Sequence, residues 1–150
     1  MGNTAFGRMG EDRACLYLEE KGMTLVTRNF RCKHGEIDLI MKDGNVFVFI
    51  EVKTRRSRLY GEPIEAVTVY KQRHIRYTAE VFLLARHLHD VRIRFDVVEV
   101  MMEPGGCVIR GMRSERGRCH VCAGIWDMYV WVEWSCDYCG GGYQPCVTGF

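Results

Sequence analysis

Two strand-like runs on either side of a tight-turn sequence constrain this chain more than any other feature. Glu36–Met41 and Val46–Lys53 are rich in apolar, β-branched and aromatic residues, and Asp43-Gly44-Asn45 separates them. Aspartate or asparagine next to glycine is typical of the two-residue turns that join antiparallel strands. The sequence therefore predicts a β-hairpin at this point, and the hairpin fixes which side chains share a face.

The hairpin brings two carboxylates to one face of the sheet whichever residues form its loop. With residues 43–44 as the loop, Asp38 lies diagonally from Glu51, and with residues 44–45 the two lie directly opposite. Both registers place the carboxylates about 5–8 Å apart. Lys53 follows Glu51 by two residues and therefore shares its face, because side chains alternate along a strand.

Two carboxylates and a lysine are costly on strands that are otherwise apolar, because buried charges need partners. Oxygen ligands of this kind suit a hard cation such as Mg²⁺, which binds one or two carboxylates and keeps several waters. The alternative is a solvated strand end that carries a Glu–Lys pair. The spacing leaves both interpretations open.

The remaining elements up to residue 100 predict a mixed α/β domain. Gly10 to Lys21 has the pattern of an amphipathic helix that ends at Gly22, and Thr24–Phe30 that of a strand. Gly61-Glu62-Pro63 is expected to open a long helix that runs to about His87, and Arg92–Val100 to form a last strand. The predicted order is helix, three strands, helix, strand.

These residues resemble a known motif. Gly35-Glu36-Ile37-Asp38-Leu39-Ile40, followed by Glu51-Val52-Lys53-Thr54-Arg55, resembles the PD-(D/E)xK signature of restriction-endonuclease-like folds. Further segments resemble the YraN family of uncharacterised bacterial proteins: Gly7-Arg8, Gly10-Glu11, Arg28-Asn29-Phe30-Arg31, Gly61-Glu62-Pro63, Glu65-Ala66-Val67, Lys71-Gln72 and Arg94-Phe95-Asp96-Val97-Val98. The resemblance covers residue 7 to about residue 100 and implies an αβββαβ core with a mixed sheet.

The resemblance also implies a catalytic site. Asp38 and Glu51 would be the ligands of Mg²⁺ or Mn²⁺, with the carbonyl of Val52 as a third ligand. Lys53 would orient or deprotonate the attacking water and offset charge on the phosphate. Glu11 is similar in placement to the helix glutamate that completes the metal site of archaeal Holliday-junction resolvases. The alternative for Glu11 is a favourable interaction with the positive end of its helix.

Basic and polar residues around the motif are predicted to bind nucleic acid. Thr54, Arg55 and Arg56 follow the motif directly and can contact phosphates. Lys71 and Gln72, on the long helix, are expected to face the same cleft. The alternative for such a charged run is an ordinary solvated loop.

The resemblance ends after Val100, and the remaining residues have a different composition. Six of the eight cysteines lie there, and Pro104-Gly105-Gly106 is the expected boundary between a domain of residues 1–103 and a Cys-rich tail of residues 104–150. Two CxxC pairs, Cys119 with Cys122 and Cys136 with Cys139, stand 13 residues apart, from Ala123 to Ser135. Four such thiolates can close a tetrahedral Zn²⁺ site in a zinc ribbon. The alternative is a disordered tail with the composition of a shifted reading frame.

Charge and hydropathy restrict the partners. The chain has 21 basic and 19 acidic residues, of which 17 and 14 lie in the first hundred, so the predicted nuclease-like domain is only mildly basic. No apolar stretch is long enough to cross a membrane, and the N-terminus lacks a signal-peptide pattern. We therefore expect a cytoplasmic protein without a membrane partner.

The leading hypothesis is a metal-dependent endonuclease that hydrolyses phosphodiester bonds, with DNA as its partner. The alternative is a non-catalytic nucleic-acid-binding protein with a nuclease-like fold, and a third hypothesis is a metal-binding adaptor that acts through the tail. The resemblance also implies a homodimer, because junction-cutting proteins of this fold commonly work as dimers.

Overall fold

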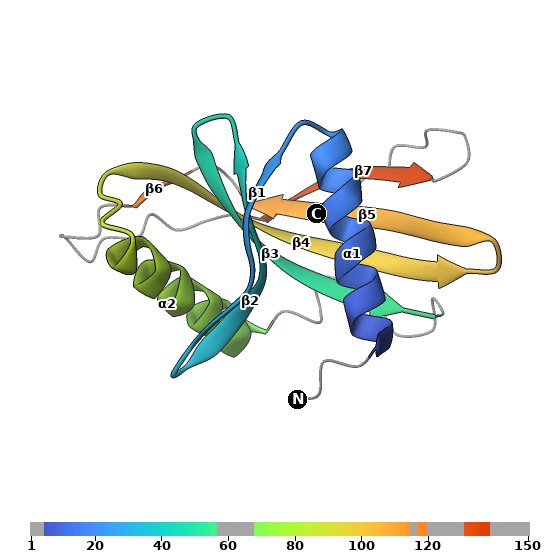
Figure 1. Cartoon of the computed structure of the whole chain (residues 1–150), viewed down its shortest axis with the longest axis horizontal. Coiled ribbons are helices and arrows are strands. Elements are labelled where there is room, and N and C mark those ends of the chain that lie inside the picture. The colour runs from blue at the N-terminus through green and yellow to red at the C-terminus, as the bar shows by residue number, and fades with distance from the viewer. Residues whose placement is uncertain (1–4, 57–67, 115–116, 120–130, 139–150) are drawn as a thin grey trace.

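The computed structural model describes residues 5–56, 68–114, 117–119 and 131–138. Within them the chain forms two helices and seven strands (Figure 1). In chain order these are α1 (Ala5–Glu20), β1 (Thr24–Cys32), β2 (Gly35–Asp43), β3 (Val46–Arg55), α2 (Val69–Ala85), β4 (Val91–Glu103), β5 (Gly106–Ser114), β6 (Gly117–Cys119) and β7 (Trp131–Tyr138). The predicted αβββαβ order and the mixed α/β class are confirmed.

The strands form one mixed sheet in the order β1-β2-β3-β4-β5-β7, and β6 pairs with β4. The β3–β4 pair is parallel and every other pair is antiparallel. A parallel pair needs a crossover connection, and α2 lies within the segment that joins β3 to β4. Figure 1 shows α1 crossing β3 and β4, and α2 running beside β2.

The β2–β3 hairpin has the second of the two predicted registers. Asp43 pairs with Val46 and Leu39 with Ile50, so Gly44 and Asn45 form the loop. Gly44 has a φ of 60°, a left-handed conformation that glycine adopts without a steric penalty. Continuing the register by one residue places Asp38 directly opposite Glu51.

The alternation of side chains along the strands produces a core on each face of the sheet. One core joins Ala14 and Leu18 of α1 to Val48, Ile50 and other sheet residues. The second joins Phe82 and Leu83 of α2 to a different set of strand residues, Phe49 among them. The strands are therefore apolar on both faces, as expected of a sheet that helices cover on both sides.

Helix α1 begins at Ala5, earlier than the predicted start at Gly10, and ends where the sequence predicted. Gly22 has a φ of 91°, and its backbone N–H donates to the carbonyl of Glu19. Glycine at this position closes a helix because it adopts the left-handed conformation that other residues avoid.

Helix α2 begins later than predicted. Thr68 has an extended backbone and its hydroxyl accepts a hydrogen bond from the N–H of Lys71 at 3.2 Å, so it is the N-cap of a helix that starts at Val69. The expectation of a continuous helix from Gly61-Glu62-Pro63 is therefore wrong, because a capping threonine precedes the first turn. Residues 57–67 themselves lie outside the described residues.

Strand β5 follows the predicted boundary and continues the same sheet. It pairs with β4 from Glu103↔Gly106 to Asp96↔Arg113, so Pro104 and Gly105, directly after the predicted boundary, form the turn between two neighbouring strands. Cys107 and Ile109 are part of the core beneath α1. We describe β5 with the sheet to which it belongs, and the division into a domain of residues 1–103 and a tail of residues 104–150 stays a prediction.

A buried ion cluster ties the start of β4 to the β2–β3 turn. Arg94 is fully buried and its guanidinium donates to both carboxylate oxygens of Asp96, with Nε–Oδ1 at 2.9 Å. Its Nη1 also donates to Asp43 Oδ2 at 2.9 Å. Asp96 thus has a structural role, because its carboxylate offsets the buried charge of Arg94.

Neither helix in the described part of the chain has the length and apolarity that a membrane crossing requires. The cytoplasmic location and the homodimer stay predictions from the sequence.

Candidate functional site

The site is centred on two carboxylates from neighbouring strands. Asp38 of β2 is 8% exposed and Glu51 of β3 is 4% exposed. Asp38 Oδ2 accepts a hydrogen bond from the backbone N–H of Val52 at 2.7 Å, which holds its side chain against β3. The predicted pair is therefore brought together and removed from solvent.

Two lysines from different elements meet Glu51. Lys53 Nζ lies 2.8 Å from Glu51 Oε1, and Lys71 Nζ, from the first turn of α2, lies 3.3 Å from the same oxygen. The second oxygen, Oε2, is buried and accepts no hydrogen bond from any residue that the structure describes. A buried carboxylate oxygen without a donor is unfavourable, so it is a natural position for a cation or a water ligand.

The pKa of Asp38 is raised from its ordinary value of 3.8 to about 7. Burial is the largest cause, because it penalises the charged form, and the negative charge of Glu51 is the second. The hydrogen bond from Val52 acts in the opposite direction, and Glu11 and Glu36 add smaller upward effects. Burial and the neighbouring carboxylates thus both disfavour the charged form of Asp38.

Glu11 lies beside the pair and is held there by a residue that the sequence analysis did not single out for the site. Asn29 Nδ2 donates to Glu11 Oε2 at 3.2 Å. Asn29 lies between the pairs Arg28↔Leu39 and Phe30↔Ile37, so it stands opposite Asp38 in the β1–β2 register. Its φ of 50° is left-handed, which asparagine tolerates better than most residues. An asparagine inside a strand-like run was the only signal for it in the sequence.

Helix α1 approaches β3 closely enough to bring Glu11 near the site. A Cβ atom added at Gly10 would lie 1.8 Å from Thr54 Oγ1, so only glycine fits at this crossing. Thr54 therefore packs against α1, on the opposite side of the strand from Lys53 and Glu51.

The donor set fits a hard divalent cation. All the candidate ligands are oxygens, and Glu51 Oε2 has no hydrogen-bond donor among the described residues. Burial, and after it neighbouring negative charge, raises the pKa of Asp38. In the described ranges no three His, Cys, Asp or Glu side chains gather closely enough to hold a metal ion. The arrangement is therefore a two-carboxylate pair with Glu11 beside it, and Mg²⁺ is commonly bound by one or two carboxylates and water.

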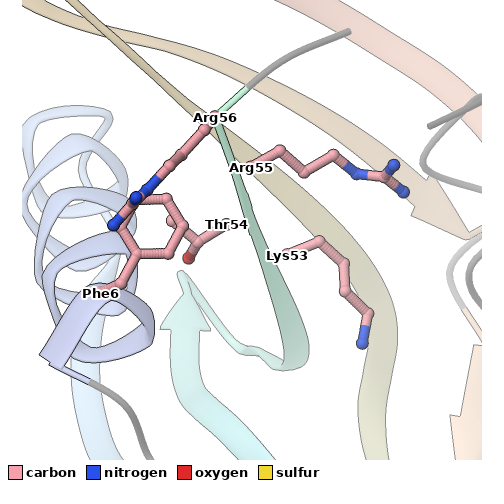
Figure 2. A pocket seen from close by; sticks show the side chains of 5 residues that line it. All are labelled: Phe6, Lys53, Thr54, Arg55 and Arg56. Atoms are coloured by element: carbon pink, nitrogen blue, oxygen red, sulfur yellow. The ribbon is translucent and has the colours of Figure 1, made fainter. Parts of the chain in front are cut away.

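The residues after the motif are divided between the two sides of β3. Figure 2 shows Lys53 and Arg55 extending from one side, while Thr54 and Arg56 turn toward α1. The guanidinium of Arg56 stacks on the ring of Phe6, with its Cζ 4.4 Å from the ring centroid. Together these residues line a pocket of about 420 Å³.

Arg55 has a structural partner within the fold. Its Nε lies 2.9 Å from Glu99 Oε1 of β4, and the side chains are 15% and 3% exposed. This ion pair offsets the charge of the buried Glu99 carboxylate. Of the residues predicted to bind nucleic acid, Lys71 contacts Glu51 directly, whereas Gln72 forms a backbone hydrogen bond to Thr68 in the first turn of α2.

Two of the four cysteines of the predicted zinc site, Cys119 and Cys136, lie in strands that the structure describes. The backbone of Cys119, in β6, pairs with Val91 at the start of β4. That of Cys136, in β7, pairs with Arg110 of β5. Cys122 and Cys139 lie outside the described residues, so the zinc site stays a prediction.

Comparison with known proteins identifies relatives for the part of the chain that contains the site. A family model described as "Uncharacterised protein family UPF0102" matches residues 10–100. A UPF0102 protein of Caldicellulosiruptor saccharolyticus is 48% identical over 102 residues, which is 68% of this chain and 86% of that protein.

Two further relatives match this chain over similar lengths. A UPF0102 protein of Rhodococcus jostii is 52% identical over 103 residues, covering 69% of this chain and 87% of that protein. A UPF0102 protein of Clostridium botulinum is 48% identical over 101 residues, covering 67% and 82%. The family match ends at residue 100, so it includes Glu11, Asp38, Glu51 and Lys53 and excludes β5 and the cysteine pairs.

Proposed function

This chain belongs to the uncharacterised protein family UPF0102, the YraN family, and from the site just described we propose that it is a metal-dependent nuclease that hydrolyses phosphodiester bonds. The observation that carries the proposal is the buried Asp38–Glu51 pair, in which one oxygen of Glu51 lacks a hydrogen-bond donor among the described residues. If the two carboxylates had only a structural role, we would expect the oxygens of both to accept hydrogen bonds from the protein.

The carboxylates of the site would have different roles in such a reaction. Asp38 and Glu51 would hold Mg²⁺ or Mn²⁺, and when bound the cation would stabilise the negative charge that develops on the phosphate. The hydrogen bond from Val52 fixes the direction in which Asp38 presents its oxygens. Glu11, held by Asn29, completes the acidic side of the site.

Lys53 stands between the carboxylates and the adjoining pocket. Its ammonium contacts Glu51 and the residue also lines the pocket of about 420 Å³ (Figure 2). A phosphate in that pocket would meet a cation on the side where the carboxylates lie, and Lys53 would orient the attacking water. Arg56 adds a second cation at the pocket, whereas Arg55 is engaged with Glu99.

The test is cleavage of labelled linear, flapped, four-way and single-stranded nucleic acids with Mg²⁺, Mn²⁺ or a chelator. Wild type is compared with Asp38→Asn and Lys53→Ala, and with Lys42→Ala, which removes a lysine from the same hairpin outside the site. We expect metal-dependent cutting that both site variants reduce about a hundredfold or more and that Lys42→Ala leaves intact.

A binding measurement separates the nuclease from a non-catalytic nucleic-acid-binding protein. Titration with Mn²⁺ should show a site in wild type and a weaker one in Glu51→Gln, independent of any cleavage. Binding of nucleic acid without cutting by any form of the protein would support the non-catalytic alternative. Equal cutting by wild type and both site variants would assign the activity to a contaminant and overturn the proposal.

A further inference from the structure

A second pocket lies where the end of the β1–β2 hairpin meets the start of α2, and the function proposed above does not use it. Its volume is about 380 Å³. It is lined by Arg31, His34 and Glu36 from the hairpin and by Tyr70, Lys71 and His74 from α2.

The hairpin and the helix are held together closely beneath this pocket. A Cβ atom at Gly35 would lie 2.7 Å from Thr78 Oγ1, so the turn approaches α2 as only glycine allows. The hydroxyl of Thr78 donates to the carbonyl of His74 at 2.8 Å, and His74 Nδ1 is hydrogen-bonded to the carbonyl of His34. The pocket is therefore built by tertiary contacts between its two sides.

The pocket adjoins the carboxylate pair. Lys71 lines it and also places its Nζ 3.3 Å from Glu51 Oε1. Glu36, on the opposite wall, is close enough to contribute to the raised pKa of Asp38. A ligand in this pocket would thus lie next to the atoms that are proposed to hold the metal.

The lining combines exposed aromatic surface with cations. Tyr70 is 73% exposed, an unusual exposure for a large aromatic side chain, and its ring lies 4.2 Å from that of His74. Arg31 is 60% exposed at the rim, where it pairs with Glu36 at 2.9 Å. Aromatic rings beside Lys and Arg are the means by which proteins bind unpaired bases and their phosphates.

We propose that this pocket binds an unpaired base of a nucleic-acid strand, with the base stacked on Tyr70 and an adjacent phosphate near Lys71. A base inside a duplex has both faces covered by its neighbours, so it cannot stack on a protein side chain unless it leaves the helix. The substrate would therefore contain unpaired nucleotides beside the bond that is cut. The cleavage part of this inference rests on the proposed function, whereas the binding part does not.

The experiment measures binding of the full chain to a single-stranded oligonucleotide that contains 2-aminopurine, in the presence of a chelator so that nothing is cut. Wild type is compared with Tyr70→Ala, with Tyr70→Phe, and with Leu84→Ala, which removes another exposed apolar side chain from the far end of α2. We expect Tyr70→Ala to bind about tenfold more weakly and to lose the fluorescence change that stacking causes. Tyr70→Phe and Leu84→Ala should bind as wild type.

The outcomes separate this inference from the nuclease proposal. If Tyr70→Ala is the only variant that binds more weakly and no form of the protein cuts nucleic acid, the base pocket is supported and the nuclease proposal is overturned. Metal-dependent cutting with unchanged binding by Tyr70→Ala would overturn the base pocket and leave the nuclease. Equal affinity of wild type for single strands and for a matched duplex would also overturn it, and would favour a protein ligand for the exposed aromatic surface.

Discussion

Asn29 combines a strained backbone with a hydrogen bond to the site, and the two contributions can be separated by mutation. Its left-handed φ of 50° disfavours residues other than glycine and asparagine, and its amide holds Glu11. Asn29→Gly keeps the backbone conformation and removes the hydrogen bond, so we expect a loss of about 0.5–1.5 kcal/mol in the free energy of unfolding.

Asn29→Val removes the hydrogen bond and also forces a β-branched residue into the left-handed region. We expect it to cost about 1–3 kcal/mol more than Asn29→Gly. Urea denaturation of both variants measures the difference, with Asn45→Gly in the β2–β3 loop as the control. Equal stability of the glycine and valine variants would show that the conformation of Asn29 carries no strain.

Asp38 should make the metal-free protein less stable as the pH rises. Its pKa is about 7 in the folded protein and near its ordinary value of 3.8 when unfolded. Between these values the folded form binds more protons than the unfolded form, so the free energy of unfolding falls with increasing pH; below about pH 4 and above about pH 7 this effect is constant.

Asp38→Asn removes this titration and keeps an acceptor for the N–H of Val52. We expect the variant to be more stable than wild type at about pH 8, by about 1–3 kcal/mol, and equally stable at about pH 4. Denaturation across this pH range in a chelator provides the measurement, and Glu20→Gln, at the end of α1, is the control. A wild-type pH dependence that persists in Asp38→Asn would contradict the assignment.

At the scale of elements, buried ion pairs connect particular strands. Apolar residues alone would not specify which strands lie next to each other, because apolar contacts are not directional. Arg94 joins β4 to the β2–β3 turn through Asp96 and Asp43, and Arg55 joins β3 to Glu99 of β4. Each pair satisfies a charge that would be costly alone in the sheet. The second pair also explains why Arg55, although it follows the motif, is largely withdrawn from solvent.

Asp96→Ala leaves the fully buried guanidinium of Arg94 without its principal partner. We expect this single change to lower the free energy of unfolding by about 3–5 kcal/mol, because the buried guanidinium then keeps only the partly exposed carboxylate of Asp43 as a partner. The double variant Arg94→Met/Asp96→Leu removes both charges and should recover most of the loss. Chemical denaturation of the three proteins tests this; a double variant no more stable than Asp96→Ala would show that the cluster does more than neutralise charge.

At the scale of the whole molecule, the sheet extends past the part of the chain that the family match covers. Cys107 and Ile109 of β5 pack beneath α1 together with Val98 and Val100 of β4. The family model matches residues up to 100, so β5 lies beyond the matched residues and still contributes to the core beneath α1.

Two truncations test how much of the tail the core needs. A chain that ends at Glu103 lacks β5 and exposes the apolar edge of β4, so we expect it to aggregate or to unfold at a lower temperature. A chain that ends at Cys119 keeps β5 and β6 and should retain most of the thermal stability of the full chain. Equal melting temperatures for the two truncations would instead support the predicted division after residue 103.

Much of the fold and of the site follows from local sequence. Turn chemistry at Gly44 and the two-residue period of strands place Asp38, Glu51 and Lys53 on one face of the sheet, and Gly22 ends α1. These features depend on residues within a few positions of one another, so the sequence by itself determines them.

Other features depended on how the elements pack. Lys71 reaches Glu51 from α2, Asn29 holds Glu11 across two elements, and Arg55 pairs with Glu99. The sequence left two possible registers for the hairpin, and the structure has one of them. The predicted start of α2 at Gly61-Glu62-Pro63 was wrong, because Thr68 caps a helix that begins at Val69. Contacts between residues far apart in the chain depend on the distances and burial that packing creates, so only the tertiary structure decided which further charges join the predicted Asp38–Glu51 pair.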